Sequence, residues 1–139
     1  MYLVRLIYAS KASDRVTQED IQQIVASAKE NNGKSELSGL LCFNRKYFLQ
    51  VLEGSRSKVN ATYRHIMKDP RHTDVVLISY EEIAMRKFEQ WHMGYVPEAG
   101  INSEISLRYS GHRDFDPYEM SGESCLGMML ELRETVPVV

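Results

Sequence analysis

The chain has 139 residues, of which 43% are hydrophobic and 26% charged, a composition typical of one globular domain with its own core. Its formal net charge of −2 excludes a general electrostatic attraction to nucleic acid or to an anionic membrane. No run approaches the roughly 20 apolar residues of a membrane helix, and the early Arg5 does not fit a signal peptide. Cys42 and Cys125 stand in unrelated contexts and form no disulfide framework, so we expect a cytoplasmic protein.

The first predicted strand covers residues 2–8, and its apolar residues on both faces favour a central position in a sheet. It ends at Tyr8. Taken alone, Tyr8 is either an ordinary strand-end tyrosine with its hydroxyl in water or a member of a site.

A helix is predicted to begin after Thr17, which can cap it and is followed by two acids in the first turn. Spacings of three and four give this helix one buried stripe, made of Ile21, Ile24, Val25 and Ala28. Continuing the stripe places Asn31 and Asn32 on the inner face, just before Gly33, where we expect the helix to stop. One asparagine can be a C-terminal cap, but two at core positions favour a polar site.

A hairpin is predicted next, with strands at residues 40–43 and 47–53 joined by residues 44–46. In its second strand Gln50 shares one face with Phe48 and Leu52. A buried amide without partners costs about 1–3 kcal/mol, so Gln50 must meet a polar group. That group is either neighbouring backbone or water, or part of a functional site.

A second helix is predicted from a cap at Ser57 to the region of Asp69, because Pro70 disfavours helix in the residue before it. Its buried stripe consists of Val59, Tyr63, Ile66 and Met67. Basic residues flank this stripe and follow the helix: Arg64, His65, Lys68, Arg71 and His72. They form either a solvated face or a local phosphate site.

Two more strands are predicted, one at residues 75–80 with apolar residues on both faces and one at residues 91–96. Because side chains alternate along a strand, Trp91, Met93 and Tyr95 are expected to share one face. The change of composition after Pro97 marks the end of this region.

Residues 98–139 begin with small and polar residues and regain helical spacing at Leu126, Met129 and Leu130. We expect one or two short helices, forming a C-terminal extension that is not an independent domain. This extension either packs on the sheet or offers an adaptable methionine-rich contact surface.

The order of elements predicts an α+β fold of the ferredoxin-like type, βαββαββ, with two helices on one face of a mixed sheet. Tyr8, Gln50, Asn31 and Asn32 would then converge in one gap with basic residues at its mouth, an arrangement suited to a flat heterocycle. The opposite sheet face should be apolar. We therefore expect a homo-oligomer, unless the extension covers that face.

Motifs of common enzymes are absent, including GxGxxG, GxxxxGK[ST], GxSxG and HExxH. The four histidines lack metal-ligand spacing, and no RNP1-like run supports RNA binding. We expect no enzyme, no metal site and no nucleic-acid partner. Two alternatives are a small ferredoxin-like acyl-phosphate hydrolase, supported by fold pattern alone, and a non-catalytic interaction module with satisfied polar groups in its core.

Several segments resemble, in the right order, the BLUF family of blue-light sensors that use flavin. These segments within residues 1–96 are LIYAS (6–10), Asn31-Asn32, LSGLL (37–41), FLQVLEG (48–54), DPRH (69–72) and WHM (91–93). The resemblance implies a flavin-binding domain at residues 1–97, followed by an extension at residues 98–139 like that of short stand-alone members. It also implies a photoreceptor that relays its state to a separate downstream protein.

The resemblance implies non-covalently bound FAD, with FMN or riboflavin as alternatives, between the two helices. Asn31 and Asn32 would hold the polar edge of the isoalloxazine, and Gln50 would reach its N5 and C4 carbonyl. Tyr8 would hydrogen-bond Gln50 and supply an electron and a proton to the excited flavin, after which the Gln50 amide rearranges. Met93 and Trp91 would carry the change into the last strand, with Trp91 pointing inward or outward. Further expected flavin contacts are Ile24, Ala28, Lys29, Phe48, Leu52, Arg64, His65, Ile66, Asp69 and His72.

Overall fold

The computed structural model describes residues 2–137. Its sheet has five strands in the order β4-β1-β3-β2-β5. These are β1 (Leu3–Ala12), β2 (Ser38–Phe43), β3 (Tyr47–Ser55), β4 (His72–Ile83) and β5 (Gly94–Val96). All neighbouring strands run antiparallel except β2 and β5, which run parallel. The predicted mixed sheet is therefore confirmed, with β1 and β3 inside it.

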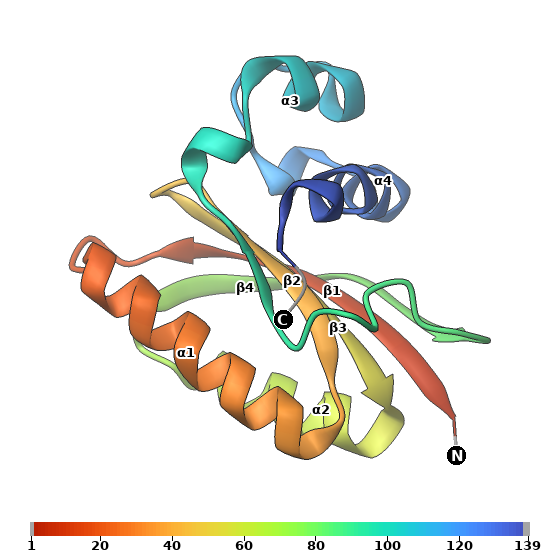
Figure 1. Ribbon diagram of the computed structural model, residues 1–139. Helices are drawn as coiled ribbons and strands as arrows, with labels where there is room; N and C mark the ends of the chain where they lie inside the picture. Colours follow the sequence, from red (N-terminus) through yellow and green to blue (C-terminus); the bar gives the residue numbers. More distant parts are fainter. Residues whose placement is uncertain (1, 138–139) are drawn as a thin grey trace.

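Helices cover both faces of this sheet (Figure 1). On one face lie α1 (Gln18–Ser35) and α2 (Arg56–Met67), and on the other lie α3 (Ser103–Ser110) and α4 (Gly122–Leu132). Short 3-10 turns occupy Glu98–Gly100, Pro117–Glu119 and Arg133–Thr135. The α+β class, the pair of helices on one face and the helical extension are confirmed. No helix within the described residues has both the length and the apolar character needed to cross a membrane.

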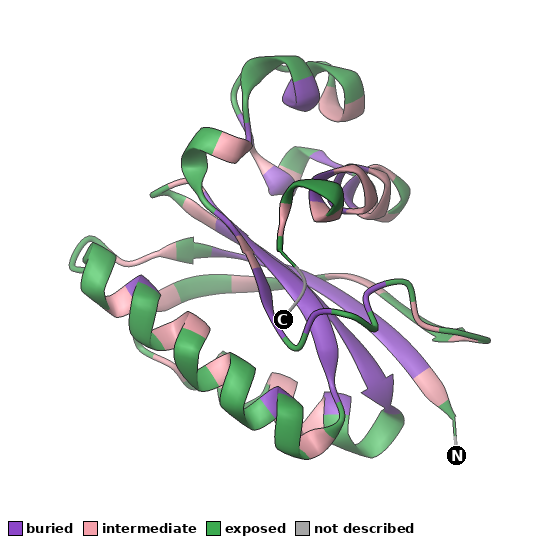
Figure 2. Ribbon diagram, viewed as in Figure 1, coloured by how far each residue is buried: buried purple, intermediate pink, exposed green. Residues whose placement is uncertain are grey.

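The central strands β1 and β3 supply side chains to two separate cores, because successive residues of a strand point to opposite faces. Leu6, Tyr8 and Leu52 belong to the core beneath α1 and α2. Ile7 and Val51 belong to the core beneath the C-terminal extension. Strands β1 and β3 are buried along most of their length (Figure 2). The functional residues of β1 and β3 are thus fixed by packing on both sides.

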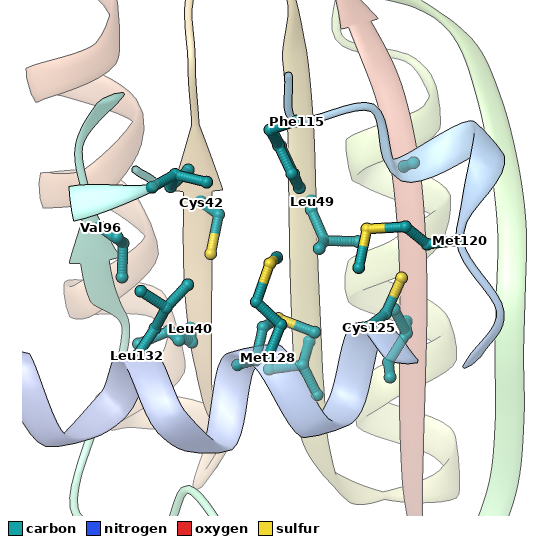
Figure 3. Close-up of a cluster of buried hydrophobic side chains, with 14 of the residues drawn as sticks. Leu40, Cys42, Leu49, Val96, Phe115, Met120, Cys125, Met128 and Leu132 are labelled. Carbon is teal, nitrogen blue, oxygen red and sulfur yellow. The ribbon is translucent and has the colours of Figure 1, made fainter. Parts of the chain in front are cut away.

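The extension closes the second core with α4, whose inner side is rich in sulfur (Figure 3). Cys125, Met128 and Met129 of α4 are fully buried there, near Cys42 and Leu49 of the sheet. Burial raises the pKa of the Cys125 thiol to about 12, so it stays protonated and acts as a small apolar side chain. Since α4 covers this face, the face no longer argues for a homo-oligomer, which stays a prediction.

Several predicted boundaries were wrong, and the ends of the two helices show why. Helix α1 runs through Gly33 and ends at Ser35, after which Glu36 takes a left-handed φ of 57°. Helix α2 starts at Arg56, so Ser57 is not its cap. Local residue preferences predicted the end of α1 and the start of α2 to within two or three residues. The exact boundary depends on packing in the folded chain.

The fourth strand has apolar residues on both faces, yet it is not buried on both. Strand β4 is an edge of the sheet, and Val76 and Leu77 are 43% and 50% exposed. An apolar run cannot distinguish an inner strand from an edge strand, because position in the sheet depends on residues far away in the sequence.

Candidate functional site

A cavity of about 200 Å³ opens between α1, α2 and the inner strands. The strands contribute Tyr8, Leu41, Phe48, Gln50 and Leu52, and α1 contributes Ile24, Ser27, Ala28, Asn31 and Asn32. The end of α2 and the segment after it contribute Thr62, His65, Ile66, Asp69, Arg71 and His72. Every residue named above as an expected flavin contact lines this cavity, except Lys29 and Arg64.

Three side chains form a hydrogen-bonded series at the floor of the cavity. Tyr8 and Gln50 sit directly opposite each other in the β1–β3 register, and Tyr8 Oη donates to Gln50 Oε1. Gln50 Nε2 in turn donates to Met93 Sδ over 3.3 Å. Tyr8 and Gln50 are 3% and 5% exposed, and burial raises the pKa of the Tyr8 phenol far above its ordinary value. The phenol therefore keeps its proton at neutral pH and offers it to the Gln50 carbonyl.

The two asparagines of α1 lie at different depths. Asn32 is 2% exposed, and its Nδ2 donates to the backbone carbonyl of His92 over 2.5 Å. Its own backbone carbonyl accepts from Leu37 N over 2.9 Å, so backbone and side chain are both held. Asn31 is exposed at the cavity mouth. Only Asn32 thus occupies the inner position predicted for the pair.

At the mouth, Asp69 and Arg71 form a bidentate ion pair, with distances of 2.6 to 3.1 Å between guanidinium nitrogens and carboxylate oxygens. The hydrogen bonds from Arg71 hold the pKa of the Asp69 carboxyl below its usual value. Because Asp69 engages Arg71, the basic cluster seen in the sequence places no free arginine here for phosphate chemistry. The hydrolase hypothesis gains no support from this cavity.

His72 has a positioning role that the sequence did not reveal. Its Nε2 lies 2.6 Å from the carbonyl of Ile66, and a carbonyl only accepts, so Nε2 carries the proton. Its Nδ1 lies 2.7 Å from Ser10 Oγ. His72 therefore ties the end of α2 to β1, beside the rings of Tyr8 and Phe48. Within residues 2–137 no group of histidine, cysteine and acidic side chains is arranged to hold a metal ion.

Replacing Asp69 with asparagine is expected to lower stability at pH 7 by less than about 1 kcal/mol, because the pair is partly exposed. The folded pKa of Asp69 is lowered, so its contribution is present above the unfolded value of 3.8 and is lost as the pH falls through the folded value. Urea unfolding from pH 7 to pH 3 checks this. A difference between wild type and variant that does not shrink with acid would contradict it. Glu30→Gln, in the exposed pair with Lys34, serves as the control.

The structure separates His65 from Arg64, which the sequence left as alternatives. His65 lines the cavity, whereas Arg64 lines a shallow surface cleft together with Arg56 and Asn60. Lys29 is exposed on α1 and lies outside the lining. Arg64 and Lys29 therefore do not line this cavity, because both helices turn these positions toward solvent.

Three lining residues were missed by the sequence analysis: Ser27, Leu41 and Thr62. Arg71 was named only as a member of the basic cluster. Helical spacing could have found two of the three. Ser27 lies four residues before Asn31, and Thr62 lies four before Ile66, so each shares a helix face with a predicted contact. Leu41 pairs with Gln50 in the β2–β3 register, a neighbour that only the strand pairing reveals.

Trp91 and Met93 lie on opposite sides of the sheet, contrary to the prediction that they share a face. Met93 is fully buried beside Gln50, while Trp91 belongs to the core under the extension and its Nε1 donates to Val136 O over 3.3 Å. Residues 91–93 are not part of a strand, since β5 begins at Gly94. The alternation rule therefore does not apply to them, and the indole points away from the cavity.

A buried carboxylate fixes the segment that leads to Met93. Glu53 is fully buried and accepts from Arg5 Nε over 2.8 Å. It also accepts from the backbone N–H groups of Lys87 and Phe88, at 3.0 and 2.8 Å. Glu53 lies on the same strand as Gln50, so β3 supplies part of the floor of the cavity and also fixes the segment that leads to Met93.

Comparison with known proteins matches the part of the chain that contains all the cavity-lining residues. Residues 3–94 match the BLUF family, described as sensors of blue-light using FAD. The blue light- and temperature-regulated antirepressor BluF of Escherichia coli (strain K12) is 36% identical over 86 residues, covering 62% of this chain and 21% of that protein. The photoactivated adenylate cyclase subunit beta of Euglena gracilis is 31% identical over 90 residues, covering 64% of this chain and 10% of that protein. This chain thus corresponds to about a fifth or less of these relatives.

Solved structures match over nearly the full chain. BlsA in its photo-activated state has a TM-score of 0.84 at 27% identity, covering 94% of both chains. The dark-state structure of BlrB, described as a BLUF protein, has a TM-score of 0.79 at 27% identity, covering 96% of both chains. These two matches include the C-terminal extension as well as the cavity region.

Proposed function

The chain belongs to the BLUF family, and from this premise we propose that it is a blue-light photoreceptor that holds FAD non-covalently in the cavity between α1, α2 and the sheet. The observation that carries the proposal is the buried series from Tyr8 through Gln50 to Met93. Members of this family are sensors of blue light, and this chain is a sensor and not an enzyme.

The donors and acceptors along the cavity fit the polar edge of a flavin, which presents two carbonyls on either side of an N–H. Within the described residues Asn32 Oδ1 has no protein donor, while Nδ2 is held by His92, so Oδ1 suits an N–H of the ligand. Gln50 has a second amide hydrogen beyond the one given to Met93. Ile24, Phe48 and Ile66 give apolar surface for a flat ring system. A bound flavin would supply the absorption of blue light and the capacity to take up an electron and a proton.

The side-chain amide of Gln50 is the group whose orientation can differ between the dark state and the state formed by light. As it stands, its carbonyl accepts from Tyr8 and its amide N–H donates to Met93. Reversing the amide would place an N–H toward Tyr8 and an oxygen toward Met93 Sδ, which has no hydrogen to give. The two orientations thus differ in their contact with Met93. We propose that this difference is relayed to a separate partner protein.

An absorption spectrum of the purified protein before and after blue light tests the proposal. Flavin bands with a red shift that reverses in the dark are the expected result. Bound flavin without a shift would reject the proposed role of Gln50. Absence of flavin binding even after FAD is added would reject the photoreceptor as a whole.

Replacing His65 with alanine is expected to weaken FAD binding about fivefold, equal to one hydrogen-bonded contact of about 1 kcal/mol. Arg64→Ala is the matched control, because its side chain lies outside the cavity, and its affinity should stay near that of the wild type. Titration of flavin-free protein with FAD measures both. Equal losses in the two variants would show that general positive charge, not contact with the cavity, attracts the cofactor.

A further inference from the structure

The segment between β4 and β5, residues 84–93, is here called the connector. It has no regular structure, yet Phe88, Trp91 and Met93 within it are buried. One end is fixed, because Glu53 binds the N–H groups of Lys87 and Phe88. The other end, at residues 91–93, is where the cavity and the C-terminal extension meet.

Residues 133–136, here called the strap, lie on the connector. Trp91 Nε1 donates to the carbonyl of Val136 over 3.3 Å, and Arg133 donates to the carbonyl of Lys87. The Arg133 guanidinium also stands 6.0 Å from the centre of the Phe88 ring, within the range of cation–π attraction. A Cβ added at Gly94 would come within 3.2 Å of Val136, so backbone and strap are in close contact there.

The cavity holds the same short stretch of connector from the other side of the sheet. Asn32 Nδ2 binds the carbonyl of His92, and Gln50 Nε2 binds the sulfur of Met93. Three successive residues therefore link the two regions. The side chain of Trp91 contacts the strap, while the carbonyl of His92 and the side chain of Met93 bond to Asn32 and Gln50, which line the cavity. The hydrogen bonds of Asn32 and Gln50 thus hold residues that also support the strap.

We propose that the strap is a latch whose docking on Trp91 is coupled to the hydrogen bonds of the cavity. When Asn32 holds His92, the indole is presented to Val136 and the strap is closed. When that bond is lost or redirected, the strap opens more often and solvent reaches Trp91. Local opening of this kind is expected for a short segment that is held by a few polar contacts. The inference rests on the proposed function only for the identity of the ligand, since the coupling uses contacts within the chain.

Coupling of this kind is reciprocal, because the free energy that links two sites is the same in both directions. A cavity ligand that changes strap docking by some factor must bind more or less tightly by that factor when the strap is weakened. The effect of the cavity on the strap and the effect of the strap on ligand binding can therefore be tested separately, and the first test needs no flavin.

Trp91 is the only tryptophan of the chain, so acrylamide quenching of its fluorescence reports directly on the strap. In flavin-free protein, Asn32→Ala is expected to at least roughly double the quenching constant by increasing local opening. Asn31→Ala is the matched control, since Asn31 lines the mouth but is exposed. Unchanged quenching in a folded Asn32→Ala variant, or an equal rise in both variants, would overturn the coupling.

Arg133→Gln tests the strap from its own side and does not threaten the core, because Arg133 is partly exposed. It should raise Trp91 quenching to a similar degree, while Arg113→Gln, at an exposed arginine of the same extension, should not. FAD affinity that differs at least about threefold between Arg133→Gln and wild type would support reciprocity. Equal affinities would overturn it. Failure of every variant to bind FAD would refute the photoreceptor, while the flavin-free quenching comparison would still decide the latch.

Discussion

Replacing Glu53 with alanine is expected to lower the free energy of unfolding by about 3–5 kcal/mol, the cost of breaking a buried ion pair by removing one partner. The change would leave Arg5, which is 3% exposed, with Glu81 as its remaining acidic partner. It would also strip the N–H groups of Lys87 and Phe88 of their acceptor. Urea unfolding followed by circular dichroism measures the loss.

Glu82→Ala is the matched control for that experiment. Glu82 is exposed, and its partner Arg56 lies at the surface, so its removal should cost less than about 1 kcal/mol. A loss of similar size in both variants would show that the burial of Glu53 adds nothing to its contribution to the free energy of unfolding. Glu53→Gln keeps the shape and one acceptor oxygen, and its stability should fall between those of alanine and wild type.

Replacing Gln50 with leucine is expected to abolish the light-induced spectral shift while FAD stays bound. Leucine fills a similar space on β3 but offers neither an acceptor to Tyr8 nor a donor to Met93. The buried Tyr8 hydroxyl then loses its partner, at a cost of about 1–3 kcal/mol in stability. Difference spectra before and after blue light measure the shift, and the flavin-to-protein absorbance ratio measures retention.

Two further variants make the Gln50 result specific. Met93→Leu removes the sulfur acceptor but keeps the bond between Tyr8 and Gln50, so a shift should persist. Tyr8→Phe removes the donor and should behave like Gln50→Leu. A full, reversible shift in Gln50→Leu would mean that the amide of Gln50 is not the switch.

The fold followed from the sequence where periodicity and element order were decisive. The stripe of α1 and the hairpin of β2 and β3 gave the right elements, because side-chain spacing and turn chemistry act over a few residues. The edge position of β4 did not follow, because the neighbours of a strand depend on residues far away in the sequence. The Arg5–Glu53 pair spans 48 residues, beyond the reach of any local pattern.

The residues of the cavity could be placed together from the sequence, but their individual orientations could not. The sequence showed Tyr8 at the end of a strand and Gln50 between two large apolar residues. The register that makes them opposite neighbours is visible only in the structure. The prediction that Trp91 shares a face with Met93 failed because residues 91–93 lie outside the strand, where Glu53 and Asn32 hydrogen-bond the connector backbone. These hydrogen bonds involve main-chain groups, which every residue carries, so the sequence of side chains does not reveal them.

The stretch that matches the family ends at residue 94, yet the sheet face formed by Ile7, Leu49 and Val51 is closed by α4, beginning at Gly122. The core of the sheet therefore extends beyond the residues that the family model covers. A shortened chain ending near Val96 would expose a continuous apolar face and would be prone to aggregation. We therefore expect truncation to lower solubility by exposing this face, and such a loss would not by itself report on the cavity between α1 and α2.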